Sequence, residues 1–256
     1  MLSGISVSAA GYQREDIENV ESDRLILGQQ WQHELDNGWL QVLSLRWEGE
    51  RFNIGNDEET GSTSLLLPGV GYSKLHQDSS LDPSQGYRLQ LDVTGSHRAV
   101  LSDVDILHIS ALAKGLYTLA GRHRFLARFQ FGAVATNRFE NVPPSLRFFA
   151  GGDQSVRGYG YETLSPENDN GVPVGGRYLL VGSGEYQYQF ADRWRLAAFV
   201  DHGNAINDLY DPLATGAGLG LRWISPVGPL RLDIAKGLDP EFGGTWRLHF
   251  SMGPEL

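Results

Sequence analysis

The sequence contains no cysteine and no apolar run long enough for a transmembrane helix, and these absences exclude several classes of protein. Without cysteine, the 256-residue chain can form neither a disulfide framework nor a thiolate metal site. A membrane-spanning helix needs about 20 consecutive, mostly apolar residues. Helical periodicity is also missing, so a helical bundle is excluded as the main architecture.

Positive charge is scarce as well. The 21 Lys and Arg residues are outnumbered by 31 Asp and Glu, which gives a net charge of −10. Because nucleic-acid binding requires clustered positive charge, no nucleic-acid partner is predicted. Only Lys74, Lys114 and Lys236 are lysines, and the other cations are arginines. The planar guanidinium of arginine suits buried or lumen-facing networks of hydrogen bonds.

What the chain has instead is alternation of apolar and polar residues from one end to the other. Near the C-terminus, for example, Trp246, Leu248 and Phe250 share one face, and Arg247 and His249 share the other. This period of two is typical of β-strands with one apolar face. The pattern predicts twelve strands, at Leu2–Gln13, Ser22–Glu34, Trp39–Asn53, Ser62–Gln77, Tyr87–Ala99, Val104–Leu119, Arg122–Arg138, Arg177–Phe190, Arg193–Asn207, Thr215–Ile224, Pro229–Gly237 and Gly244–Met252.

A water-soluble sandwich has the same period, but two further features favour a barrel that spans a membrane. The segments run to about 10–15 residues, which exceeds the usual soluble strand and matches a tilted membrane span. Aromatic residues gather near segment ends, as the girdles of outer-membrane barrels do. They are Trp31, Trp39, Trp47, Tyr117, Tyr186, Tyr188, Phe190, Trp194 and Trp223.

The connections alternate in length, which is a third feature of such barrels. Short ones are predicted at Leu35–Gly38, Asp82–Gly86, Ala120–Gly121, Ala191–Asp192 and Ser225–Gly228; longer ones at Glu15–Glu21, Gly55–Gly61, Val142–Gly176, Asp208–Ala214 and Leu238–Gly243. We therefore predict an all-β, antiparallel transmembrane β-barrel of twelve strands. It would lie in the bacterial outer membrane, in contact with lipid and lipopolysaccharide, with both chain ends on the short-turn, periplasmic side.

The longest interval without a strand pattern contains Arg147–Tyr161, a stretch rich in glycine and aromatic residues. Pro143, Pro144 and paired glycines disfavour a continuous strand or helix there. A loop of this length in a compact domain is usually functional or disordered. Its apolar side chains, such as Phe148 and Val156, favour burial and hence an ordered loop.

This stretch resembles the long lumen loop of the bacterial outer-membrane assembly factors, the superfamily that includes BamA and TamA. The match centres on Val156, Arg157, Gly158 and Tyr159, in the Val/Ile-Arg-Gly-Phe/Tyr motif of that superfamily. The preceding Arg-Phe-Phe-Ala-Gly-Gly-Asp string, with Gly151, Gly152 and Asp153, is more similar to TamA than to BamA. Downstream, Phe199, Asp201 and Gly203 match the Phe-x-Asp-x-Gly motif, and the Met-Gly-Pro-Glu-Leu ending looks TamA-like.

The resemblance implies a barrel of sixteen strands preceded by periplasmic POTRA domains, and the chain departs from this pattern. We expect residues 1–256 to form one barrel domain that lacks the first four family strands and the POTRA domains. No signal-peptide pattern follows Met1, which we attribute to a missing N-terminal region. Alternatively, twelve strands close by pairing Leu2–Gln13 with Gly244–Met252.

The resemblance also implies a function in outer-membrane protein insertion and autotransporter assembly, with a TamB-like periplasmic partner, autotransporter clients and no cofactor. The last strand, with Trp246, Leu248 and Phe250 on one face, resembles the signal by which the barrel-assembly machinery recognises its own substrates. The alternative is a passive or plugged twelve-stranded channel without insertase activity.

The central residue of this hypothesis is Arg157. A loop folded into a lumen needs an anchor, and a guanidinium forms charge-assisted bonds with carboxylates. Glu185 and Asp201 are the predicted acceptors, because alternation places both on the inner face of their strands. The competing interpretation is a solvated surface arginine.

An enzyme is not predicted. Some twelve-stranded outer-membrane barrels are phospholipases, but this sequence has no Gly-x-Ser-x-Gly motif. Its seven histidines show no shared spacing, and no metal site is predicted.

Overall fold

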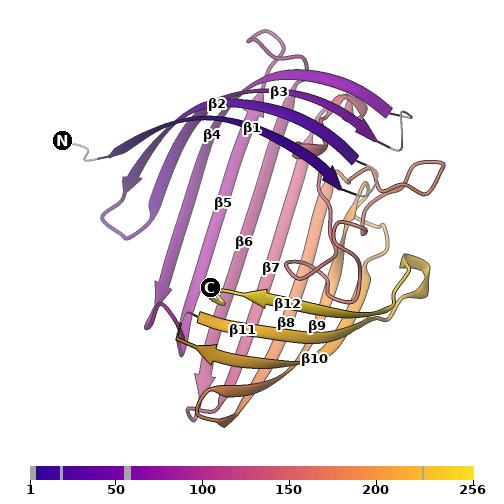
Figure 1. The fold of residues 1–256 in the computed structure, drawn as a ribbon. Coiled ribbons are helices and arrows are strands. Elements are labelled where there is room, and N and C mark those ends of the chain that lie inside the picture. The colour runs from indigo at the N-terminus through magenta and orange to yellow at the C-terminus, as the bar shows by residue number, and fades with distance from the viewer. Residues whose placement is uncertain (1–3, 18–19, 55–58, 227) are drawn as a thin grey trace.

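The computed structural model describes residues 4–17, 20–54, 59–226 and 228–256. It confirms an all-β chain with twelve antiparallel strands in one sheet, ordered as in the sequence (Figure 1). The strands are β1 (Ile5–Ile17), β2 (Val20–Glu34), β3 (Leu40–Ile54), β4 (Glu59–Gln77), β5 (Gln85–Ser96), β6 (Ile106–Leu119), β7 (His123–Ala135), β8 (Tyr178–Ala191), β9 (Trp194–Ile206), β10 (Ala214–Ser225), β11 (Gly228–Gly237) and β12 (Trp246–Met252). Short 3₁₀ helices lie at Phe139–Asn141, Pro144–Leu146 and Pro240–Phe242.

The sheet presents an apolar outer face and a polar inner face. In β9, burial alternates strictly from Trp194 to Asp201. Leu196 and Val200 are exposed on the outside, whereas Phe199 and Asp201 are buried inside. This is the reverse of a water-soluble protein and is the arrangement of a barrel whose outer wall faces lipid. Within the described residues, no helix combines the length and the hydropathy that crossing a membrane requires.

The sheet curls strongly but remains open. Among the described residues, β1 pairs with β2 and β12 pairs with β11, and no pairing joins β1 to β12. The alternative in which Leu2–Gln13 pairs with Gly244–Met252 is therefore wrong for this structure. Figure 1 shows β1 and β12 on opposite sides of the opening. Both strands have a free edge with unpaired backbone groups.

The two ends of the sheet differ as predicted. Connections at 35–39, 78–84, 120–122 and 192–193 lie at one end, which we call the turn end; 97–105, 136–177, 207–213 and 238–245 lie at the other, the loop end. The longest connections are at the loop end, but 78–84, predicted as a short turn at Asp82–Gly86, is as long as 207–213. One expected long connection is wrong, because β1 and β2 pair up to Ile17 and Val20. The loop predicted at Gly55–Gly61 falls largely outside the described residues, and β4 already begins at Glu59.

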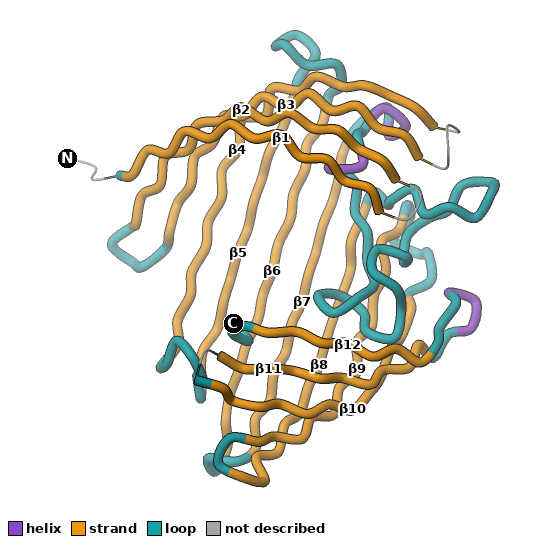
Figure 2. Tube along the Cα trace, in the orientation of Figure 1, coloured by secondary structure: helices purple, strands orange, loops and turns teal. Residues whose placement is uncertain are grey.

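The long loop between β7 and β8, residues 136–177, folds into the space enclosed by the sheet (Figure 2). Two apolar clusters hold it there. One joins Val142, Leu146 and Phe148 to residues on β4, β6, β7 and β9. The other joins Ala150, Val156, Tyr159 and Leu164 to Val181 and Ala214. The loop thus packs against both the early and the late strands, and we call it the inner loop.

Candidate functional site

Arg157 lies at the centre of a buried ion-pair network on the late strands. Its Nε and Nη2 donate to the two carboxylate oxygens of Asp201 at 2.7 and 2.9 Å, and its backbone N–H donates to Asp201 Oδ2 at 3.1 Å. Nη1 donates to Glu185 Oε2 at 2.9 Å and to Asp233 Oδ2 at 3.2 Å. The structure therefore brings together the predicted residues Arg157, Glu185 and Asp201, while their anchoring role stays a prediction.

A second arginine shares these carboxylates. Arg222 of β10 donates to Glu185 Oε1 at 2.8 Å and to Asp233 Oδ1 at 2.6 Å. Its side chain is fully buried. Three carboxylates thus meet two guanidinium groups, which makes each cation essential to the balance of buried charge. The sequence analysis did not identify Asp233 and Arg222 as members of this network, although both stand opposite apolar residues in the alternating pattern of their strands.

Burial alone would lower the pKa of the Arg157 guanidinium. The hydrogen bonds and charge of Asp201, together with the charges of Glu185 and Asp233, outweigh burial and raise that pKa above its usual range. Arg157 is therefore a permanent cation within this network.

The wall behind Arg157 is shaped to receive it. The Phe199 ring lies 3.3 Å from Arg157 Cζ, in a cation–π contact. A Cβ at Gly216 would lie only 1.8 Å from the Arg157 carbonyl oxygen, so a side chain at that position would block the loop. Glycine within a strand often marks a site where another backbone approaches closely, and at Gly216 of β10 that backbone is the inner loop at Arg157. At Gly203, a Cβ would meet the Leu180 carbonyl oxygen at 2.4 Å.

Gly158 and Tyr159 dock the loop on β10–β12. Gly158 has φ +95°, and a Cβ there would meet the backbone of Lys236 and Gly237 within 2.6 Å. The Tyr159 hydroxyl donates to the Thr215 carbonyl at 3.0 Å and accepts from the Asp239 N–H at 3.2 Å. Gly158 and Tyr159 thus both contact backbone of the late strands, and these contacts form only when the loop follows its observed path.

A histidine on the last strand also contacts the loop. The Gly158 N–H donates to His249 Nε2 at 3.1 Å, so this nitrogen is the acceptor. The ring proton therefore lies on Nδ1, which donates to Asp153 Oδ1 at 2.5 Å. Sequence reasoning predicted Asp153 as a motif residue and missed His249.

The remaining predicted loop residues shape the loop itself. Gly151 and Gly152 have φ values of +103° and +89°, which glycine adopts readily. A Cβ at Gly151 would lie 2.2 Å from the Gly160 carbonyl oxygen. Val156 is fully buried in the second apolar cluster.

The three aromatic and aliphatic residues predicted as a C-terminal signal lie elsewhere. Trp246, Leu248 and Phe250 project from the outer face of β12 and are each more than 60% exposed. They have no part in the network around Arg157.

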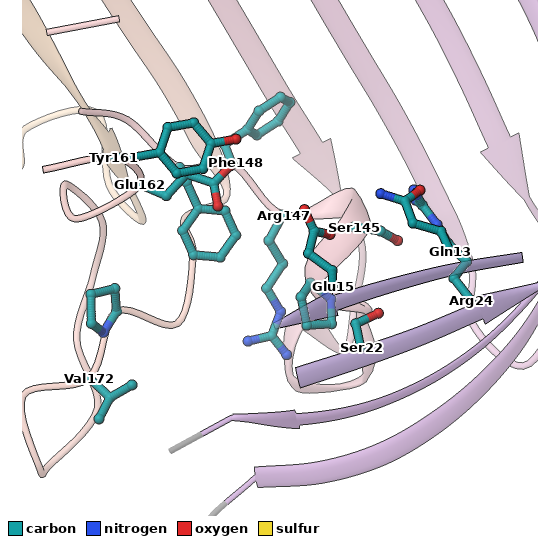
Figure 3. Close-up of a pocket in the computed structure, with 13 residues that line it drawn as sticks. Gln13, Glu15, Ser22, Arg24, Ser145, Arg147, Phe148, Tyr161, Glu162 and Val172 are labelled. Carbon is teal, nitrogen blue, oxygen red and sulfur yellow. The ribbon is translucent and has the colours of Figure 1, made fainter. Parts of the chain in front are cut away.

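The first half of the inner loop contacts the early strands. Glu50 of β3 accepts hydrogen bonds from Ser22 of β2 and Ser145 of the loop. The Phe148 ring stacks on His108 at 4.8 Å. A cavity of about 350 Å³ lies between the loop and β1–β2; Figure 3 shows Arg147, Tyr161 and Glu162 on the loop side. The loop therefore bridges the two flanks of the open sheet.

The residues after β12 enter the same interior. Glu255 accepts from Arg124 Nη1 at 2.8 Å and from Gln187 Nε2 at 2.7 Å. Gln187 also donates to Glu185 Oε1 at 2.8 Å. One chain of hydrogen bonds thus connects the end of the chain to the Arg157 network, which nothing in the sequence predicted.

Comparison with known proteins shows the family to which this chain belongs. Residues 7–255 match the Omp85 superfamily domain, which covers nearly the whole chain. The chain belongs to the Omp85 superfamily. Membership in this family of outer-membrane β-barrels confirms the expectation that the chain is not an enzyme. Among the described residues, no group of three or more His, Cys, Asp or Glu is arranged to hold a metal ion.

Two Omp85 relatives are a BamA and a chloroplast outer envelope protein, and neither supports a specific similarity to TamA. The chain is 29% identical over 221 residues to the outer membrane protein assembly factor BamA of Nitratidesulfovibrio vulgaris, covering 80% of this chain and 28% of that protein. It is 32% identical over 145 residues to the chloroplastic outer envelope protein 80 of Arabidopsis thaliana, covering 52% and 18%. The chain thus spans less than a third of the length of these curated relatives.

Solved structures of low sequence identity share the fold. BamA from Haemophilus ducreyi lacking POTRA domains 1–3 has a TM-score of 0.80 at 15% identity, covering 96% of this chain and 57% of that one. CdiB from Acinetobacter baumannii has a TM-score of 0.54 at 13% identity, covering 98% and 50%.

Proposed function

We propose that this chain is the barrel of an outer-membrane protein assembly factor, which helps β-barrel proteins to insert into the membrane. The observation that carries the proposal is the open sheet: β1 and β12 each leave one edge unpaired in the described structure. An unpaired edge can hydrogen-bond an incoming strand without first breaking existing pairs. The activity is non-enzymatic, since it requires pairing of backbone groups and no covalent chemistry.

The inner loop has a supporting role in this proposal. An open, curled sheet has little to hold its two flanks apart at a fixed distance. The inner loop contacts Glu50 on one flank and Asp201 on the other. We infer that Arg157 anchors the loop so that it keeps the opening in shape while strands are exchanged at the edges.

We further infer a TamA-like specialisation, because the Arg-Phe-Phe-Ala-Gly-Gly-Asp string and the C-terminal Met-Gly-Pro-Glu-Leu are more similar to TamA. The clients would then be autotransporters and the periplasmic partner a TamB-like protein. The turn end, with both chain ends, would face the periplasm.

Reconstitution into liposomes tests the proposal. The chain, embedded alone, should accelerate folding of an autotransporter β-domain added in urea, compared with empty liposomes. A simple eight-stranded outer-membrane barrel, added in parallel, separates TamA-like selectivity from general assistance. Equal folding rates with and without the chain would contradict the proposed function.

The alternative of a passive, plugged channel is tested in planar bilayers. A passive channel would conduct without accelerating any client. Because the inner loop fills part of the lumen, we expect at most a small conductance, and removing residues 147–161 should enlarge it.

A further inference from the structure

Three cations stand in register on the inner face of the sheet, towards the turn end. Arg88 of β5 is directly opposite Lys114 of β6, and Lys114 is directly opposite Arg128 of β7. We call these three residues the cation row. Like charges directly opposite on neighbouring strands destabilise a sheet. Repulsion between the three cations therefore lowers the stability of the folded chain. A negatively charged partner would relieve this repulsion.

The cation row has few partners among the described residues. Arg88 donates to the side chain of Gln90 at 3.2 Å, and Arg128 Nη2 donates to the Ser155 carbonyl. Within the described structure, the buried Nε of Arg128 has no hydrogen-bond partner, and neither has the buried Nε of Arg231 on β11. Leaving a buried donor without an acceptor costs about 1–3 kcal/mol.

A small cavity connects these cations. It has a volume of about 60 Å³, and Lys114, Arg128 and Arg231 form part of its wall. A water molecule occupies about 30 Å³ in the liquid, so the cavity has room for about two waters or one carboxylate group. The two arginines with unpaired donors thus line a space of the size that an anionic group requires.

The carboxylates beside this cavity are committed to other cations. Glu255 pairs with Arg124, and Glu185 pairs with Arg157 and Arg222. Asp153 pairs with His249 on the last strand. Four cationic side chains, Lys114, Arg128, Arg157 and Arg231, line the cavity against three carboxylates, Asp153, Glu185 and Glu255, so cations are in slight excess among its lining side chains.

We propose that the cation row and Arg231 bind an acidic, extended segment of another polypeptide that enters the barrel from the turn end. The structure already seats one segment of this kind next to the row: residues 253–256 lie in the interior, and Glu255 contacts Arg124 and Gln187. Adjacent strands are about 4.8 Å apart, so the row spans about 10 Å. Alternate side chains of an extended segment are about 6.7 Å apart, within reach of long Arg and Lys side chains.

A polypeptide fits this site better than other anions. Lipid headgroups contact the outer wall of a barrel, whereas the cation row faces the interior. The net charge of −10 disfavours nucleic acid. The proposal goes beyond the proposed function, because it concerns the inner face of the sheet rather than its free edges.

Fluorescence anisotropy tests the site with the chain in detergent micelles. The probe is a labelled short peptide of alternating Thr and Glu, and the control probe replaces every Glu with Gln. We expect the Glu peptide to bind about tenfold more tightly or better. Lys114→Gln and Arg128→Gln should each weaken its binding about tenfold. Arg98→Gln removes the same charge near the loop end, where Arg98 pairs with Asp105, and should leave binding unchanged.

Three results would overturn the proposal. Equal binding of the two peptides would show that charge is not recognised, and unchanged binding by both variants would place the contact elsewhere. Displacement of the peptide by inorganic phosphate at equal concentration would identify a general anion site rather than a polypeptide site.

Thermal unfolding without peptide supplies an independent readout. Lys114→Gln should leave the melting temperature unchanged or raise it, because it relieves repulsion within the row; a marked fall would show that Lys114 is structural and contradict the proposal. A chain that binds the Glu peptide but accelerates no client would contradict the proposed function alone, so the two failures are distinguishable.

Discussion

Replacing Arg157 with alanine should strongly destabilise the docked inner loop. Arg157 is 7% exposed, and Asp201, which accepts three of its hydrogen bonds, is fully buried. Arg157→Ala would leave Glu185 and Asp233 with Arg222 and would leave the buried Asp201 without its cation. Removing one partner of a buried ion pair costs about 3–5 kcal/mol, mostly because the remaining charge is buried without compensation.

The assay is urea unfolding in detergent micelles, followed by the fluorescence of the six tryptophans. Limited proteolysis of residues 136–177 in the folded protein reports on loop docking separately. Arg138→Ala is the matched control, because it removes the same charge from an exposed side chain of the same loop. We expect it to change the free energy of unfolding by less than about 0.5 kcal/mol.

A double-mutant cycle distinguishes lost attraction from stranded charge. Asp201→Asn in the Arg157→Ala background should recover part of the lost stability, because it removes the buried carboxylate that has lost its cation. Arg157→Lys keeps the charge but loses the planar fork, so it should fall between wild type and alanine. Unchanged unfolding and unchanged protease resistance in Arg157→Ala would refute the anchor.

Further predictions concern three other contacts of the interior. Gly158→Ala should release the loop, because a Cβ there meets the backbone of Lys236 and Gly237. Gly171→Ala, with φ +74° but only an ordinary contact to Glu167 at 3.7 Å, should cost only about 1–2 kcal/mol, and similar urea midpoints for the two would contradict this reasoning. His249→Gln should keep an acceptor for the Gly158 N–H, whereas His249→Leu should increase cleavage of the loop; equal cleavage would show that the contact is dispensable. Asp82, at the turn end, is partly buried, but hydrogen bonds from Arg195 and the charges of Arg124 and Arg195 hold its pKa below the usual 3.8. Its stabilising effect should therefore be present above pH 3.8 and be lost as the pH falls through its lower pKa in the folded chain. Melting temperatures of wild type and Asp82→Asn should differ at pH 7 and converge in strong acid, and a constant difference would refute the assignment.

The strands and their faces could be predicted from the sequence, because alternation depends only on local order. Leu196 and Val200 against Asp201, for example, fix the inner face of β9 without any tertiary information. The pairing of Arg157 with Glu185 and Asp201 followed from the same alternation together with the family resemblance.

What could not be predicted depends on how the strands are staggered and curled. Alternation alone puts Asp233 and Arg222 on the inner face, but their distance from Arg157 follows from the register of β8 to β11. His249 reaches Gly158 only because the loop returns to the last strand. Whether β1 meets β12 is set by the curvature of the whole sheet, which no local pattern encodes.

The central claim, that the free edges of the sheet receive client strands, can be tested by disulfide cross-linking. The chain has no cysteine, so a single cysteine introduced at Val7 on β1 or at Phe250 on β12 provides a unique reporter. Phe129→Cys is the control, because Phe129 is also exposed on the outer face but lies on β7, which is paired on both sides. During folding of a client with a cysteine in its terminal strand, we predict cross-links at an edge position and none at residue 129. Equal cross-linking at residues 7, 129 and 250, or none at either edge, would contradict the account.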